Sequence, residues 1–242
     1  MQIIKIKSSL GSLGKNKGTE KAPDLILKDL KGNFQILEIK EENNLDKLNK
    51  KLENTQGDIF IGGDHSITYS LFKGLKGVNK GLIMFDAHPD CDTYTNTATH
   101  EDFLRKLVDE NQIKKENIIL IGLRSYSNNE INFLKENKIK YYTTEKIFDI
   151  GIKEITEIIM EIANTFSDLY ISIDIDVLDP CYAPGTGYQE PAGLSTLELI
   201  YILKKLKLLK NLRRIDLVEV NPNKDINNLT INVAKKILKV FI

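Results

Sequence analysis

Short apolar runs rich in β-branched residues recur along the whole chain, separated by more polar segments. Runs of this kind, bounded by polar residues and glycines, are typical of β-strands. We therefore predict strands at residues 3–6, 34–39, 58–62, 81–85, 117–123, 168–175 and 214–220.

Between these runs, apolar residues recur at the spacing of an amphipathic helix. The clearest stripe, in the segment that starts at Ile152, consists of Ile155, Ile158, Ile159 and Ile162. Further helices are predicted from Phe103, from Thr196 and over residues 229–242. Strands that alternate with helices indicate βαβ units, so we predict an α/β fold with a mainly parallel sheet covered on both faces.

Acids, histidines and an asparagine follow four of the predicted strands. In open parallel sheets, ligands bind beyond the carboxyl ends of the strands, so these side chains are expected to gather at one edge. The four segments are GGDHS (62–66), DAHPD (86–90), DIDVLDP (174–180) and EVNP (219–222).

In the second segment, Asp86, His88 and Asp90 occupy every second position. A strand places alternate side chains on one face, so we expect these three to converge. Converging carboxylates are unfavourable in a low-dielectric place unless a cation lies between them. The alternative interpretation is a loop start with solvated acids.

Six side chains after the strands are candidate metal ligands: His65, Asp86, His88, Asp90, Asp174 and Asp176. They are too many for one catalytic ion and fit two divalent ions, with Asp86 and Asp174 bridging. The oxygen-rich mixture favours Mn²⁺ over a thiolate-type zinc site, and Mg²⁺ would use fewer nitrogen ligands. Two ions about 3.5–4 Å apart can share a water molecule and lower its pKa. Each histidine alone is more typically an ordinary hydrogen-bonded residue.

Composition narrows the class of protein. The 242 residues suit a single domain spanning 1–242. Lys+Arg and Asp+Glu are 34 each, which argues against a nucleic-acid partner held by a basic field. The chain shows neither an apolar run long enough to span a membrane nor a signal-peptide core, so no membrane partner is expected. Two cysteines make no disulfide framework, and we expect a cytoplasmic protein.

Taken in order, the motifs resemble those of the ureohydrolase family, which comprises arginases, agmatinases, guanidinobutyrases and formiminoglutamases. The matching pieces are KGTEKAPDLIL (17–27), GGDHS, DAHPD, SIDIDVLDP (172–180), APGTGYQEPAGL (183–194) and DLVEVNP (216–222). They cover nearly the whole chain. The resemblance implies an arginase-like three-layer α/β/α fold with two Mn²⁺ per chain and a trimeric or hexameric homo-oligomer.

The resemblance also implies roles for the site residues. One ion would be bound by His65, Asp86, Asp90 and Asp174, and the other by Asp86, His88, Asp174 and Asp176. Glu219 matches the family's guanidinium-binding glutamate, because a planar two-oxygen acceptor suits a planar two-donor group. Asp176 would assist proton transfer to the leaving amine.

His100 matches the position of the family's proton-shuttling histidine, which would make it both catalytic and substrate-binding. It is followed by Glu101, where the family commonly has glycine. The alternative is a helix N-terminal residue, with Glu101 and Asp102 placed against the helix dipole. For Arg124, the sequence favours a structural ion pair or an oligomer contact.

The substrate is the least determined feature. The loop after DAHPD does not match the arginase pattern, although Asn96 within it is a candidate substrate-binding residue. Glu190 is typical of agmatinase-like chains, whereas Tyr188, Gln189 and Ala192 depart from the common pattern. We predict hydrolysis of agmatine to putrescine and urea. The alternatives are an arginase, a formiminoglutamase or another guanidino-acid hydrolase, and a non-catalytic metal-binding protein of the same fold.

Overall fold

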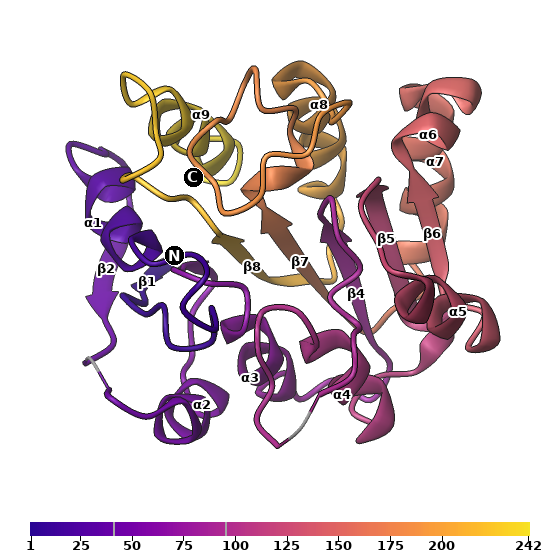
Figure 1. The fold of residues 1–242 in the computed structure, drawn as a ribbon, viewed down its shortest axis with the longest axis horizontal. Coiled ribbons are helices and arrows are strands. Elements are labelled where there is room, and N and C mark those ends of the chain that lie inside the picture. The colour runs from indigo at the N-terminus through magenta and orange to yellow at the C-terminus, as the bar shows by residue number, and fades with distance from the viewer. Residues whose placement is uncertain (41, 95) are drawn as a thin grey trace.

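The computed structural model describes residues 1–40, 42–94 and 96–242. Within these residues the strands form one eight-stranded sheet, in the order β2-β1-β3-β8-β7-β4-β5-β6, and all neighbouring strands are parallel (Figure 1). The strands are β1 (Gln2–Lys5), β2 (Gln35–Glu38), β3 (Ile59–Ile61), β4 (Lys80–Phe85), β5 (Ile118–Leu123), β6 (Lys140–Thr143), β7 (Asp168–Asp174) and β8 (Leu212–Val218).

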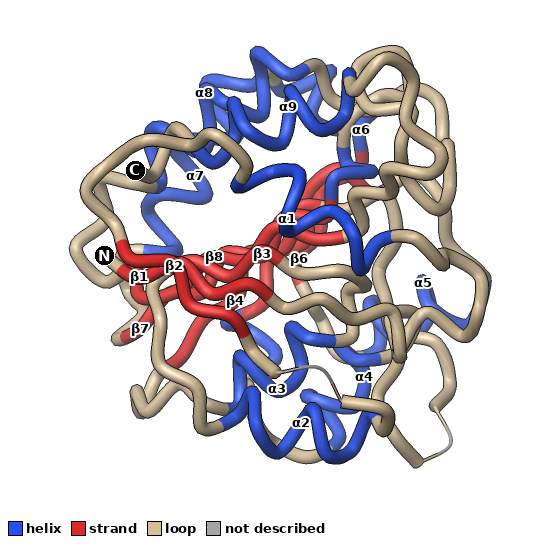
Figure 2. Tube along the Cα trace, turned by 90° about the vertical axis from the view of Figure 1, so that its left-hand side faces the viewer, coloured by secondary structure: helices blue, strands red, loops and turns tan. Residues whose placement is uncertain are grey.

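Helices cover both faces of the sheet. Figure 2 shows α1, α6, α7, α8 and α9 on one side and α2, α3, α4 and α5 on the other, which gives the predicted three-layer α/β/α arrangement. The helices are α1 (Ala22–Leu27), α2 (Leu45–Glu53), α3 (Ile67–Lys73), α4 (Phe103–Asp109), α5 (Asn128–Glu136), α6 (Thr144–Ile150), α7 (Ile152–Ala163), α8 (Thr196–Leu206) and α9 (Leu229–Leu238).

The core lies in two layers because successive strand residues point to opposite faces. In β4, Ile83 and Phe85 pack in the cluster that includes α7, α8 and α9. Leu82 and Met84 pack in the cluster that includes α2, α3 and α4. This two-sided burial explains why the central strands are continuously apolar in sequence.

All seven predicted strands are present, with ends that differ by one or two residues. The sequence interpretation missed β6, an edge strand of sequence KYYT whose first residue, Lys140, is exposed. In α7, Ile155 and Ile159 are buried as predicted, whereas Ile158 and Ile162 are half-buried. Ser195 and Glu198 form a capping box at the start of α8.

The sheet order determines where the site lies. Strands β3, β8, β7 and β4 are direct neighbours in the middle of the sheet, although they are far apart along the chain. Their carboxyl ends therefore bring the four polar segments together. Among the described residues, no helix is both long and apolar enough to cross a membrane.

Candidate metal centre and active site

The candidate ligands lie just beyond the strands rather than on them. Strand β4 ends at Phe85, and the left-handed backbone of Asp90 (φ 48°) turns the chain back. The backbone N–H of His88 donates to Asp86 Oδ1 at 2.7 Å within this turn. The expectation that strand alternation brings Asp86, His88 and Asp90 together was therefore wrong in its reason, because a tight turn produces the convergence.

The first group of ligand atoms surrounds His65. Its Nδ1 lies 3.1 Å from Asp86 Oδ2, 2.9 Å from Asp90 Oδ2 and 3.3 Å from Asp174 Oδ2. Ligand atoms around an octahedral ion with bonds of about 2.1 Å are themselves about 3 Å apart, so these spacings suit one ion. The structure thus brings together all four residues predicted for the first ion.

The second group surrounds His88. Its Nδ1 lies 3.1 Å from Asp176 Oδ2 and 3.5 Å from Asp86 Oδ1. Asp86 therefore offers one oxygen to each group, as a bridging ligand must. Asp174 Oδ1 instead accepts the backbone N–H of Asp176 at 2.8 Å, so bridging by Asp174 stays a prediction.

Two buried atoms support a cation in this place. Among the described residues, His65 Nδ1 and Asp86 Oδ2 are buried without a hydrogen-bond partner. Buried polar atoms are almost always satisfied, so such a pair calls for an ion or a proton between its members. The nitrogen and oxygen donors fit a divalent ion of the Mn²⁺ type.

The charges of the group are strongly coupled. Burial and the neighbouring charge of Asp86 raise the pKa of Asp90 to about 8. Burial alone would lower the pKa of His88, but the carboxylate of Asp176 outweighs it and raises this pKa to about 12. Burial alone would raise the pKa of Asp176, but the neighbouring His88 outweighs it and lowers this pKa to about 2. The ion pair between His88 and Asp176 thus offsets part of the repulsion among the carboxylates.

A buried network behind His65 fixes the orientation of its ring. Ser172 Oγ donates to Asp216 at 2.7 Å and therefore accepts from His65 Nε2, also at 2.7 Å. With its proton on Nε2, the neutral ring leaves the Nδ1 lone pair facing the ligand group. Thr68 and Tyr170 donate to the same carboxylate at 2.6 Å each. Sequence reasoning missed Asp216, although an acid inside the apolar run RIDLV was the available signal.

Glu219 follows β8 in a left-handed conformation (φ 62°), and its side chain is almost fully buried. Its Oε1 accepts the backbone N–H of His65 at 2.7 Å and lies 3.3 Å from His100 Nδ1. Its Oε2 accepts the side-chain amide of Asn16 at 2.5 Å. Glu219 therefore does not present two free oxygens, contrary to the sequence expectation, and no motif pointed to Asn16.

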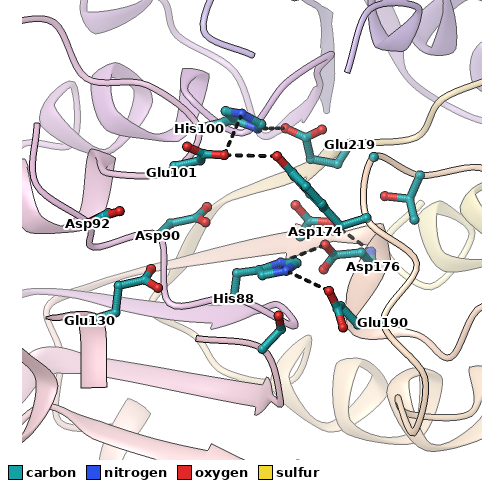
Figure 3. A pocket seen from close by; sticks show the side chains of 14 residues that line it. His88, Asp90, Asp92, His100, Glu101, Glu130, Asp174, Asp176, Glu190 and Glu219 are labelled. Carbon is teal, nitrogen blue, oxygen red and sulfur yellow. Dashed lines mark hydrogen bonds and ion pairs between the residues drawn. The ribbon is translucent and has the colours of Figure 1, made fainter. Parts of the chain in front are cut away.

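His100 lies inside the site. Its ring is 5% exposed and lies directly beside the carboxylate of Glu219 (Figure 3). Burial would lower its pKa, but the hydrogen bond with Glu219 raises it to about 9. The helix N-terminal alternative is confirmed in part, because Asp102 is the N-cap of α4, which begins at Phe103 two residues after Glu101. The predicted proton-shuttle role fits this position.

Asn96 lies elsewhere. Its side chain is exposed, and it is not among the described residues that line the cavity. The Lys106 ammonium donates to its backbone carbonyl. This placement argues against the predicted substrate contact.

The cavity next to these groups has a volume of about 310 Å³. The ring of Tyr188 stacks near His100, with centroids 6.4 Å apart, and its hydroxyl donates to Glu101 at 3.1 Å. Beyond the ligands, Glu219 and His100, the charged residues that line the cavity are Asp92, Glu101, Glu130 and Glu190 (Figure 3). The described part of this lining contains no lysine or arginine.

Residues around the site hold its loops. Asp64 accepts the backbone N–H groups of Gly11 and Ser66, each at 3.0 Å. Asp179 accepts those of Cys181 and Gly193, so both acids orient nearby backbone. Ser66 does not share this role through its hydroxyl, which is buried without a partner among the described residues.

Two glycines and Arg124 also shape the loops, and for Arg124 the expected ion pair needs correction. Gly185 and Gly187 are required by close approach, because a Cβ at Gly187 would lie 2.7 Å from Asn16 Nδ2 and one at Gly185 would lie 2.7 Å from Asp225 Cβ. Arg124 donates to backbone carbonyls, including those of Asp176 at 2.6 Å and Glu190 at 2.8 Å, rather than to a carboxylate. It links two loops of the site.

Comparison with known proteins identifies the group to which the chain belongs. Residues 6–242 match the arginase family. An arginase of Staphylococcus aureus (strain COL) is 34% identical over 235 residues, which cover 88% of this chain and 76% of that protein.

Two solved structures have the same fold. The formimidoylglutamase of Bacillus subtilis superposes with a TM-score of 0.92 at 26% identity, covering 99% of this chain and 85% of that one. The agmatine ureohydrolase of Thermoplasma volcanium superposes with a TM-score of 0.86 at 25% identity, covering 99% and 87%. With its candidate binuclear metal centre at the carboxyl edge of the same sheet, the chain belongs to the arginase family of hydrolases.

Proposed function

We propose that the chain hydrolyses a C–N bond of a guanidino group in a small substrate with a cationic tail, and that agmatine is this substrate. The observation that carries the proposal is the charge of the cavity wall. Its described lining offers acids and no lysine or arginine. A primary ammonium group is favoured against such a wall, whereas a carboxylate is repelled.

The acids beyond the ligands differ in how far they are neutralised. Glu101 is paired with Lys15 at 2.6 Å. Asp92 accepts hydrogen bonds from the neutral Asn129 and Thr93, and Glu190 Oε1 lies 3.9 Å from His88 Nε2. Beyond the ligand groups, the wall therefore keeps net negative charge.

The proposed chemistry divides among the described groups. A pair of divalent ions, proposed to be Mn²⁺, supplies a nucleophilic water molecule of lowered pKa when bound. Glu219 holds the amidine group by accepting an N–H. Asp176 lies beside the ions and takes a proton from the attacking water molecule, and His100 hands a proton between the cavity and solvent.

The relatives keep two alternatives open. Proteins named arginase and formimidoylglutamase are both similar to this chain. Their names indicate substrates that carry carboxylates, which the acidic wall disfavours. A homo-oligomer, trimeric or hexameric, also remains a proposal, and light scattering of the purified chain tests it.

The test is product release by Mn²⁺-loaded protein, with agmatine, arginine, guanidinobutyrate and formiminoglutamate assayed side by side. Urea from agmatine at a kcat/KM at least tenfold above that for arginine is the expected result. Preference for a carboxylate-bearing substrate would refute the cationic-tail proposal. Failure of all four would favour the non-catalytic alternative, and chelated protein serves as the control.

A further inference from the structure

The loop before α1 delivers one side chain to the centre of the site. Asn16 is fully buried, and its Nδ2 donates to Glu219 Oε2 at 2.5 Å across 203 positions of the chain. Burying a side-chain amide is unfavourable unless it is hydrogen-bonded, so the hydrogen bond with Glu219 compensates for the burial of Asn16.

The amide of Asn16 is held in one orientation. Asn221 Nδ2 donates to Asn16 Oδ1 at 2.5 Å and to the backbone carbonyl of Lys17 at 3.1 Å. Since the carbonyl end of the Asn16 amide is bound to Asn221, its NH₂ end is the one that faces Glu219. Gly187 leaves room for the same NH₂ group, because a Cβ at this position would lie 2.7 Å from Asn16 Nδ2.

These contacts limit what Glu219 can offer a substrate. A carboxylate has about four acceptor sites, two on each oxygen. Oε1 faces the His65 backbone N–H and His100 Nδ1, and Oε2 already accepts from Asn16. One site, on Oε2, is therefore left.

We propose that Asn16 is a positioning residue for Glu219. It fixes the plane of the carboxylate and occupies one acceptor site of Oε2, so that the amidine group of the substrate is held through a single N–H. This inference rests on the proposed function, because it concerns how the same site binds its substrate.

The experiment measures binding of the guanidinium ion to Mn²⁺-loaded protein by calorimetry, which requires no turnover. Asn16→Leu keeps the volume of the side chain and removes the donor. We expect guanidinium to bind at least about tenfold more weakly, because the carboxylate of Glu219 is then no longer held in the plane that receives the N–H of the ligand. Asn16→Ala is the second variant in case the first does not fold, and the same direction is expected.

The control is Asn223→Ala, which removes an exposed amide from the same turn as Asn221 and should bind guanidinium like the wild type. Mn²⁺ content and the melting temperature are measured for every variant. A positioning role predicts that guanidinium affinity falls while Mn²⁺ content stays full. A merely structural role predicts that affinity, metal content and melting temperature fall together.

Asn221→Ala gives an intermediate case, since Asn16 remains but its amide is free to turn. A smaller loss than in Asn16→Leu is expected. If fully metallated Asn16→Leu bound guanidinium as the wild type does, the role of Asn16 would be refuted while the proposed function stood. If the wild type neither bound guanidinium nor released urea, the proposed function would be refuted, and this inference with it.

Discussion

At the scale of single residues, the site concentrates backbone conformations that are unusual for the residues that adopt them. Asp90 and Glu219 both have positive φ, 48° and 62°. A non-glycine residue in this region costs about 1–3 kcal/mol and persists only where the surrounding structure enforces it. The N–H of Glu219 donates to Gly63 O at 2.8 Å, which holds this turn. These backbone conformations direct the carboxylates of Asp90 and Glu219 into the cavity.

Glu219→Gln should lower kcat/KM at least tenfold, a loss of about 1.4 kcal/mol of transition-state stabilisation. The variant keeps the shape of the side chain but removes the charge that balances a cationic amidine group. Steady-state kinetics on the preferred substrate provide the measurement, and Glu116→Gln, a residue exposed on the surface, is the control. Unchanged kinetics would exclude Glu219 from the substrate contact.

Asp216→Asn should weaken Mn²⁺ binding by about 10–100-fold, the usual effect of losing a partner behind a ligand. The carboxylate accepts from Ser172, Thr68 and Tyr170, and an amide oxygen cannot satisfy all three. His65 would then lose the hydrogen bond that fixes its ring. Competition with a fluorescent chelator measures the affinity, with Asp109→Asn as the surface control. Wild-type affinity in the variant would show that His65 needs no such support.

At the scale of secondary structure elements, the central strands were predictable because their burial on both faces leaves continuous apolar runs. β6 was not, since its mixed sequence reflects an edge position that only the sheet order reveals. The ligand residues were predictable because the carboxyl ends of parallel strands share an edge. Asn16 and Asp216 were not, because their roles depend on contacts between distant segments.

Arg124 belongs to this scale because it joins the end of β5 to the loops at 176–178 and 190–191 through backbone carbonyls. Arg124→Ala should lower the free energy of unfolding by about 2–4 kcal/mol, since several buried acceptors lose their donor. Arg213→Ala, which removes an exposed ion pair with Asp168, should cost less than about 1 kcal/mol. Urea denaturation of the two variants compares them, and equal losses would contradict the role assigned to Arg124.

At the scale of the whole molecule, the buried acids make stability depend on pH and on metal. The pKa of Asp64 is raised to about 6, by burial and by Glu219, and that of Asp90 to about 8, from an ordinary value of 3.8. A raised pKa in the folded state stabilises the protein fully below the unfolded value, and this contribution is lost as pH rises through the folded value.

Chelated protein should therefore lose stability as pH rises from about 4 to 8. Mn²⁺ takes the place of the lost protons, so its stabilising effect should grow over the same range. Melting temperatures with EDTA and with excess Mn²⁺, recorded from pH 5 to 9, provide the comparison. A difference between the two curves that does not change with pH would show that protons and metal do not compete for these ligands.

The strand order also bears on how the molecule is made. The site residues come from distant segments of the chain. Up to 111 positions separate His65, Asp86 and Asp176, and Glu219 follows later in the sequence. A chain emerging from the ribosome cannot close either ion group until β7 has inserted between β4 and the place that β8 will take. Contacts between segments so far apart in the sequence form slowly, because the chain loses the entropy of loop closure before the contacts add stability. Both ion groups thus become complete after β7 and before β8 joins the sheet, and a chain stalled before residue 174 would lack ligands of both groups.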